Sequence, residues 1–200
     1  MLPELRGGNK KFIPFGGKNR GGKAFWNEQE RRYTPKTYHS FDDTKIPDSE
    51  YFKELERVSK NRIIWGGNYF LEYLGNTSCM IFWDKCRDGI SFADGEIAWT
   101  SFKQPVRRFK YKWNGMLQEQ MKEKEYRIHP TQKPVALYKW LLTKYAKEGD
   151  KILDTHVGSA SSLIACHDLH FDFIGFEIDE TYYKAAIERM EQHFAQYTLF

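Results

Sequence analysis

From residue 46 onward, segments whose apolar residues have the spacing of a helix are followed by segments whose apolar residues have the spacing of a strand. Asp48 can serve as an N-cap, and the helix predicted after it buries a face of Tyr51, Phe52, Leu55 and Val58. Short apolar runs bounded by glycine or charged residues predict strands at 62–67, 79–83, 96–102 and 108–113. Residues 1–45 show no apolar period and are rich in glycine, so we expect a basic loop region there.

The C-terminal third predicts helices and strands in alternation. Pro134 begins a helix that Gly149 ends, and its apolar face consists of Leu137, Tyr138, Leu141, Leu142 and Tyr145. A strand at 151–154, a helix at 161–169, a strand at 173–177 and a helix at 182–192 are predicted to follow. This alternation predicts an α/β fold in one domain covering residues 46–200.

Composition excludes several protein classes. The chain has 200 residues, of which 40% are hydrophobic and 16% aromatic, enough for a core and against global disorder. No apolar run is long enough to span a bilayer, and no signal-peptide core is seen, so we expect a cytoplasmic protein without a membrane partner. The three cysteines form no CxxC pair, which argues against a disulfide framework or a cysteine zinc site.

The net charge of +4 hides two basic segments. Residues 1–40 carry nine lysines and arginines against three glutamates, and residues 103–112 interleave basic with aromatic side chains. Such segments are typical of nucleic-acid contacts, and the alternative is a solvated loop and a solvated strand face. The candidate DNA-binding residues are Lys18, Arg20, Lys23, Arg107, Arg108 and Lys110.

The turn after the strand at 151–154 carries the clearest candidate chemistry. Asp154 ends that strand, Gly158 lies in the turn, and Glu177 ends the next strand 23 residues after Asp154. Nucleotide-binding folds place an acidic residue at that position to hold ribose hydroxyls. Because the turn has one glycine and no GxGxxG, we expect a nucleoside ligand without a pyrophosphate. A purely structural turn with a solvated Glu177 is the alternative.

Four motifs carry a resemblance to a known family. They are DTHVGSAS at 154–161, GFEID at 175–179, HPTQKP at 129–134 and VSKNRIIWGGNYF at 58–70. Together they resemble the β-class, circularly permuted AdoMet-dependent DNA amino-methyltransferases, in particular the phage and prophage adenine-N6 methylases, over residues 38–191. The resemblance implies a Rossmann-like class I methyltransferase sheet with helices on both faces.

The resemblance also implies the activity, the cofactor and the site. The cofactor would be S-adenosyl-L-methionine (AdoMet), and the methyl group would go to the exocyclic N6 amine of a flipped adenine in double-stranded DNA. Residues 84–128 would contact the target. The cofactor-binding residues implied are Asp154, His156, Gly158, Ser159, Glu177, Asp179, Thr131 and Lys133. We expect His156 to stack or pack there and not to act as an acid or base.

The catalytic loop of the family is the main departure. Its Asp-Pro-Pro-Tyr is absent, since no two prolines are adjacent; the nearest match, Phe12-Ile-Pro-Phe15, has Pro14 and Phe15 but no acceptor. The buried strand that precedes this loop in the family, next to the cofactor strand, is not found in residues 1–11. We therefore expect an N-terminally incomplete or decayed chain, or strands supplied by a second chain or a homo-oligomer. Asn68, before Tyr69, is the first alternative acceptor.

Two functions of different classes follow. The first is a DNA adenine-N6 methyltransferase, in a restriction-modification, orphan or phage setting. The second is a non-catalytic relic that keeps partial AdoMet and DNA binding, while cytosine-N4 or RNA methylation is a weaker third. We expect no metal site, because the spacing of His167 and His170 does not suit one helix face and no third ligand is near in the sequence.

Overall fold

The computed structural model describes residue 38 and residues 46–89, 92–114 and 117–197. The predicted basic loop at 1–45 therefore lies outside the described residues, apart from Tyr38. The DNA-binding candidates Lys18, Arg20 and Lys23, and the catalytic candidates Pro14 and Phe15, lie outside them as well.

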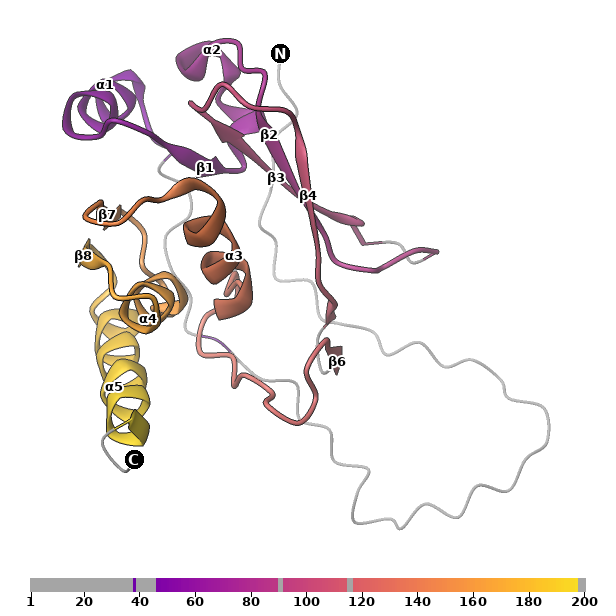
Figure 1. Cartoon of the computed structure of the whole chain (residues 1–200), viewed down its shortest axis with the longest axis vertical. Coiled ribbons are helices and arrows are strands. Elements are labelled where there is room, and N and C mark those ends of the chain that lie inside the picture. Colours follow the sequence, from indigo (N-terminus) through magenta and orange to yellow (C-terminus); the bar gives the residue numbers. More distant parts are fainter. Residues whose placement is uncertain (1–37, 39–45, 90–91, 115–116, 198–200) are drawn as a thin grey trace. The chain divides into compact units, whose positions relative to one another are not determined.

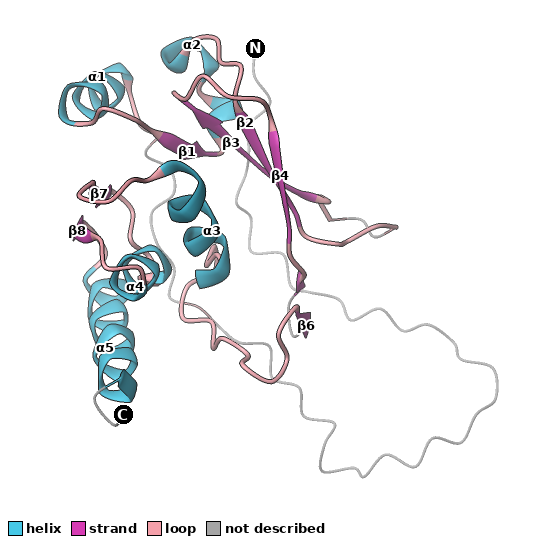
Figure 2. Ribbon diagram, viewed as in Figure 1, coloured by secondary structure: helices cyan, strands magenta, loops and turns pink. Residues whose placement is uncertain are grey.

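Four strands of the middle region form one sheet (Figure 2). They are β1 (Ile63–Trp65), β2 (Met80–Asp84), β3 (Gly95–Thr100) and β4 (Arg107–Lys110), in the order β1-β3-β2-β4. The β1–β3 and β3–β2 pairs are antiparallel, whereas β2 and β4 are parallel. All four predicted strands are confirmed, with ends shifted by one to three residues. Ile81 and Trp83 alternate with partly exposed neighbours, so one face of β2 is fully buried.

Helix α3 (Val135–Tyr145) packs on this sheet. Its buried Leu137, Leu141 and Tyr145 share a core with Ile81 and Trp83, which confirms the predicted apolar face. The helix ends at Tyr145 and not at Gly149, because Ala146 is extended. The remaining residues up to Asp150 form a separate turn, which is closed by a main-chain and a side-chain hydrogen bond between Lys147 and Asp150.

The C-terminal part is a strand–helix–strand–helix unit (Figure 1). It comprises β7 (Lys151–Asp154), α4 (Ser161–Asp168), β8 (Asp172–Gly175) and α5 (Glu180–Tyr197). β7 and β8 are parallel, as the alternation predicted. A Cβ on Gly175 would lie 2.5 Å from Val157 Cγ2 and 2.9 Å from Leu163 Cδ1, so glycine lets the turn and α4 approach β8 closely. The α/β fold class is confirmed.

Among the described residues, β7 pairs with β8 alone and β1 with β3 alone. Within the described ranges the other edge of β7 has no strand beside it, and this is the edge where the family's preceding strand was expected. Apolar side chains of the β7–β8 unit are also exposed: Leu153 by 38%, Ile174 by 62%, Phe176 by 59% and Ile178 completely. An unpaired strand edge beside exposed apolar side chains indicates a surface that another strand or chain could cover.

The remaining elements are short. α1 (Ser49–Val58) begins as predicted, because Asp48 Oδ1 accepts from the Tyr51 N–H at 3.0 Å. Val58 was expected on its buried face but is 51% exposed, since the helix ends there. The 3₁₀ turn η2 (Gly67–Tyr69), helix α2 (Leu71–Leu74) and the hairpin β5 (Trp113–Asn114) with β6 (Leu117–Gln118) were not predicted.

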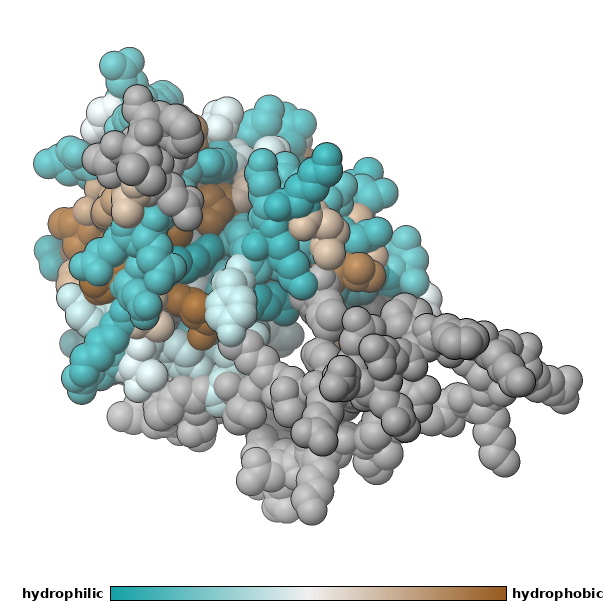
Figure 3. All heavy atoms as spheres, turned by 90° about the horizontal axis from the view of Figure 1, so that it is seen from below, coloured by the Kyte–Doolittle hydropathy of each residue, from teal (hydrophilic) through white to brown (hydrophobic). Residues whose placement is uncertain are grey.

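Surface and hydropathy add two observations. On the face drawn in Figure 3, hydrophilic side chains cover much of the described surface and apolar ones show between them. Within the described ranges, no helix combines the length and apolar character needed to cross a bilayer.

Candidate functional site

The turn between β7 and α4 is organised by Asp154. Its Oδ1 accepts from the His156 N–H at 2.9 Å, and its Oδ2 accepts from the Ser162 hydroxyl. Gly158 has φ +54°, a backbone conformation that glycine adopts without strain. Ser159 and Ala160 are buried behind it. The carboxylate of Asp154 therefore joins the first residues of the turn to the first turn of α4.

Glu177 closes the turn from the end of the next strand. Its Oε2 accepts from the Gly158 N–H at 2.7 Å, and its Oε1 accepts from the Asp179 N–H at 3.0 Å. Asp179 Oδ1 in turn accepts from the N–H groups of Thr181 and Tyr182 at 2.8 and 3.0 Å, so Asp179 is the cap of α5. The structure thus places the predicted Gly158 and Glu177 together, and gives Asp179 a capping contact.

The segment before α3 lies against the same turn. A Cβ added to Gly158 would lie 3.5 Å from the His129 ring, and that ring makes an edge contact with Tyr182 at 4.2 Å between centroids. His129 Nδ1 accepts from the Thr131 N–H at 3.3 Å, which leaves the ring proton on Nε2. Burial lowers the pKa of His129, so the ring is neutral at pH 7.

A charged pair behind the turn ties these segments together. Arg189 on α5 donates to the Ser159 carbonyl at 2.6 Å and to the Ser161 hydroxyl at 2.9 Å. Its other nitrogen donates to Glu125 Oε2 at 2.8 Å, and Glu125 Oε1 accepts from the Val135 N–H at 2.9 Å. Burial raises the pKa of Glu125 and lowers that of Arg189. This pair joins the turn to the start of α3.

Lys133 has its contacts on the four-stranded sheet. Its Nζ lies 3.0 Å from Glu96 Oε2 and 5.5 Å from the centroid of the Trp65 ring. Glu96 also pairs with Lys85. Burial raises the pKa of Glu96, but the two ammonium groups outweigh this and lower it. Lys85, Glu96 and Lys133 thus form a partly buried ion-pair cluster beside the four-stranded sheet.

A pocket of about 390 Å³ opens beside the turn. It is lined by Tyr51, Thr155, His156, Phe176, Glu177 and Ile178. Tyr51 reaches it from α1: its hydroxyl lies 2.9 Å from Thr155 Oγ1, and its ring makes an edge contact with His156. The volume is within the usual range for small-molecule sites, roughly 300–1,000 Å³. The pocket combines apolar walls with one carboxylate.

The basic strand β4 lies at the end of the four-stranded sheet. Arg107, Arg108 and Lys110 are exposed, and Arg108 Nη1 lies 4.0 Å from Asp84 Oδ2. Phe109 packs on Trp140 of α3, with 5.3 Å between centroids, and stacks on Tyr111. Phe109 thus packs partly against the core, whereas Arg107, Arg108 and Lys110 are exposed to solvent.

Several residues of the site were not predicted. Thr155, Phe176 and Ile178 line the pocket and lie within the quoted motifs, but they were not named as site residues. Tyr51 was assigned to a helix core by its spacing, although its hydroxyl reaches the turn. Glu125 and Arg189 lie in no recognisable motif. Because they are 64 residues apart, their pairing leaves no periodic pattern in the sequence. For the catalytic candidates Pro14 and Phe15, no geometry is described.

Solved methyltransferase structures share this architecture. The M1.HpyAVI–SAM complex superposes with a TM-score of 0.53 over 72% of this chain and 83% of that chain, at 22% identity. M1.HpyAVI in a second structure gives a TM-score of 0.51 over the same coverage. At this identity the similarity establishes the fold.

Curated sequences and a family profile agree with the fold. The chain is 28% identical to the type II methyltransferase M2.DpnII of Streptococcus pneumoniae over 144 residues, 72% of this chain and 53% of that protein. It is 41% identical to M.HpaI of Haemophilus parainfluenzae over 66 residues, 33% of this chain and 21% of that protein. The chain thus spans about half the length, or less, of these relatives. The DNA methylase profile of the N6_N4_Mtase family matches residues 19–188, and the chain belongs to this family.

Proposed function

We propose that this chain binds AdoMet beside the turn at 154–160 and serves methyl transfer to the N6 amine of adenine in double-stranded DNA. The observation that carries the proposal is the contact between Glu177 and the Gly158 N–H at 2.7 Å, next to an apolar pocket. Membership of the DNA methylase family and the SAM complex of the fold neighbour support it.

The residues of the pocket fit this cofactor. An ionised carboxylate offers about four lone-pair sites. Two backbone N–H groups occupy two sites of Glu177, so two remain for the hydroxyls of a ribose. Tyr51, Phe176 and Ile178 provide apolar surface for an adenine ring. Gly158 leaves open the space where a side chain would approach His129, so a ligand can lie close to the backbone.

Each residue of the turn then has a role. Bound AdoMet supplies a methyl group on a positively charged sulfur, ready for in-line transfer to an amine. Asp154 and Arg189 hold the turn in position, and the neutral His129 and Thr131 close it from the side of α3. His156 packs against Tyr51 at the pocket wall. Lys133 supports the site indirectly, because its ion pair with Glu96 attaches the segment before α3 to the four-stranded sheet.

DNA would be bound by the exposed cations of β4 together with Lys18, Arg20 and Lys23. Arg107, Arg108 and Lys110 offer charges to the phosphate backbone, whereas Phe109 is packed on Trp140. Such a protein acts in the cytoplasm, where bacterial and phage DNA lie. For the amine acceptor, Pro14 and Phe15 remain the closest match to the family loop. Asn68, exposed beside Tyr69, is the described polar side chain to test first.

Product analysis tests the proposal. The chain is incubated with methyl-labelled AdoMet and mixed genomic DNA, and the digested DNA is examined by mass spectrometry. Labelled N6-methyladenine is the expected product. N4-methylcytosine instead would place the chain on the other branch of the family. AdoMet binding without labelled DNA would contradict the transfer function and favour a non-catalytic binding module. Asn68→Ala should lower the yield if Asn68 replaces the missing acceptor.

A further inference from the structure

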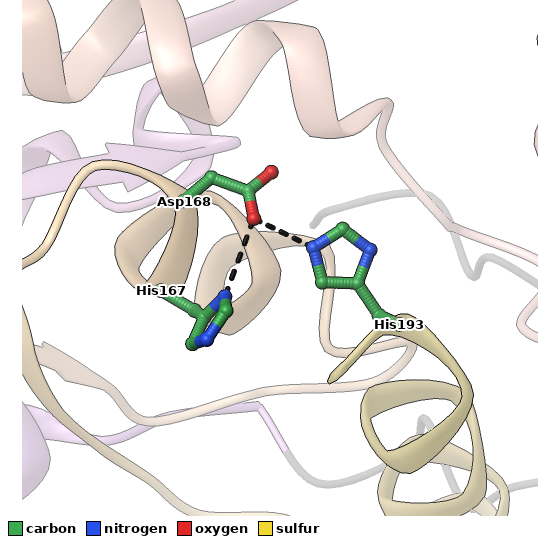
Figure 4. A group of neighbouring side chains, drawn as sticks. All are labelled: His167, Asp168 and His193. Carbon is green, nitrogen blue, oxygen red and sulfur yellow. Dashed lines mark hydrogen bonds and ion pairs between the residues drawn. The ribbon is translucent and has the colours of Figure 1, made fainter. Parts of the chain in front are cut away.

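Two histidines and an aspartate meet where α4 and α5 lie together (Figure 4). His167 and Asp168 end α4, and His193 comes from α5. Both rings are turned toward one oxygen, Asp168 Oδ1: His193 Nε2 lies at 2.6 Å and His167 Nδ1 at 3.3 Å. The three candidate ligand atoms all lie within 4.8 Å of one another.

Asp168 is a fixed anion in this cluster. Its side chain is 5% exposed, and Lys139 Nζ lies 2.7 Å from its other oxygen, Oδ2. His193 Nε2 and His167 Nδ1 lie beside its Oδ1, so nitrogen atoms of three side chains surround this carboxylate. Lys139 therefore orients the carboxylate, and Oδ1 faces the two rings. The histidine side chains are 38% and 20% exposed, which gives solvent a path to the cluster.

We propose that His167, Asp168 and His193 form a binding site for Zn²⁺ or a similar divalent transition metal. Two imidazole nitrogens and one carboxylate oxygen are ligands that zinc accepts, with bonds of about 2.0–2.2 Å. Tetrahedral ligands at that radius lie roughly 3.3–3.5 Å apart. The rings need to move by about 1 Å to reach it. Each ring then presents a lone pair, its proton residing on the opposite nitrogen, and solvent fills the fourth position.

The place of the cluster indicates a structural role. His193 follows Arg189 by one helical turn, so both lie on the same face of α5. Arg189 holds the turn at the start of α4, and the histidine cluster holds the end of that helix. A metal at the cluster would fasten α5 to the end of α4, while Arg189 holds the turn at the start of that helix. The competing account is a metal-free clamp, in which both rings donate hydrogen bonds to Asp168.

Direct metal binding separates the two accounts. The full chain, stripped with EDTA and dialysed, is titrated with Zn²⁺ by calorimetry and with Co²⁺ by visible absorption. One Zn²⁺ per chain and an intense cobalt spectrum typical of tetrahedral coordination are expected. Loss of an outer-shell partner costs about 10–100-fold in metal affinity, so removal of a ligand in His193→Gln or His167→Gln should cost more than about 100-fold. Zinc at 100 times its Kd should raise the thermal midpoint of the parent by roughly 5–10 °C.

His170→Gln is the matched control. His170 is exposed and three residues from His167, but it is not part of the cluster, so this variant should bind Zn²⁺ like the parent. Circular dichroism at 25 °C verifies that each variant is folded. The proposal is overturned if the parent binds no Zn²⁺, or if His193→Gln and His167→Gln bind it as tightly as His170→Gln. In the first case the metal-free clamp stands; in the second the metal lies on other histidines.

Discussion

Arg189 donates from α5 to the main-chain oxygen of Ser159 at 2.6 Å, across 30 residues of sequence. The Ser159 carbonyl precedes α4, and a charge-assisted hydrogen bond from a guanidinium to this carbonyl helps to fix the turn. The same guanidinium pairs with Glu125, which accepts from the first N–H of α3. This ion pair thus holds both the turn at 154–160 and the start of α3 in place.

Removing this guanidinium should destabilise the chain and weaken AdoMet binding. Arg189→Met leaves Glu125 without its cation in a site where both side chains are less than 20% exposed. We expect a decrease of roughly 2–4 kcal/mol in the free energy of unfolding, measured with urea. Lys184→Met is the control, because its pair with Glu180 on the same helix is largely exposed. Equal stability of the two variants would show that the pair does not hold the turn.

Alanine variants of Gly158 and Gly149 distinguish the effect of backbone strain from the effect of a blocked ligand site. Both have positive φ, but a Cβ on Gly158 approaches His129, whereas one on Gly149 meets no atom within 4 Å. Alanine at either position should cost about 1–2 kcal/mol of stability. Only Gly158→Ala should also lower AdoMet affinity in a calorimetric titration. If both variants bind AdoMet like the parent, the backbone at Gly158 is not part of the pocket.

The cations of β4 should determine part of the salt dependence of DNA binding. Neutralising Arg108 and Lys110 together should reduce the slope of log affinity against log salt by about 0.9 for each phosphate that no longer has a cation beside it. Lys144→Gln with Lys147→Gln removes the same charge from α3 and the turn after it, and should leave the slope unchanged. Fluorescence anisotropy with duplex DNA at several salt concentrations provides the measurement. The same slope for both double variants would make β4 ordinary solvated surface.

Acid should weaken the interaction between α4 and α5. The pKa of Asp168 is lowered from 3.8 to about 2, so its contribution to stability is complete above pH 4 and disappears as the pH falls toward 2. Asp168→Asn should therefore flatten the decline in unfolding free energy between pH 4 and pH 2. Asp172→Asn, at an exposed aspartate of β8, should follow the parent. A parallel decline in all three chains would mean that Asp168 gains nothing from its cationic neighbours.

Periodicity predicted the regular elements well because packing follows it. The buried face of α3, the parallel β7 and β8 and the cap at Asp48 all depend on local spacing and on residue types. The β5–β6 hairpin was not predicted, because strands of two residues each are too short for a period to show. The end of α3 at Tyr145 follows from the extended Ala146, which no side-chain pattern marks.

The site was predictable only where a motif carries it. Asp154, Gly158 and Glu177 are brought together as the strand–turn–helix spacing indicated. Tyr51, Arg189 and His193 reach their partners through tertiary packing over 25 or more residues, which local sequence does not record. Phe109 alternates with basic residues in a pattern typical of nucleic-acid contacts, and its packing against Trp140 is likewise not visible in that pattern.

The most direct test of the proposed function is the affinity of Glu177→Gln for AdoMet, measured by isothermal titration calorimetry. Glutamine keeps the size of the side chain but removes its charge and one acceptor oxygen. A hydrogen bond to a charged group contributes about 1.5–3 kcal/mol, so we expect AdoMet to bind roughly 10–150-fold more weakly than to the parent. Asp172→Asn, which neutralises an exposed carboxylate on β8, the strand before Glu177, should bind like the parent. Equal affinity of Glu177→Gln and the parent, with both folded, would contradict the assignment of this pocket to AdoMet.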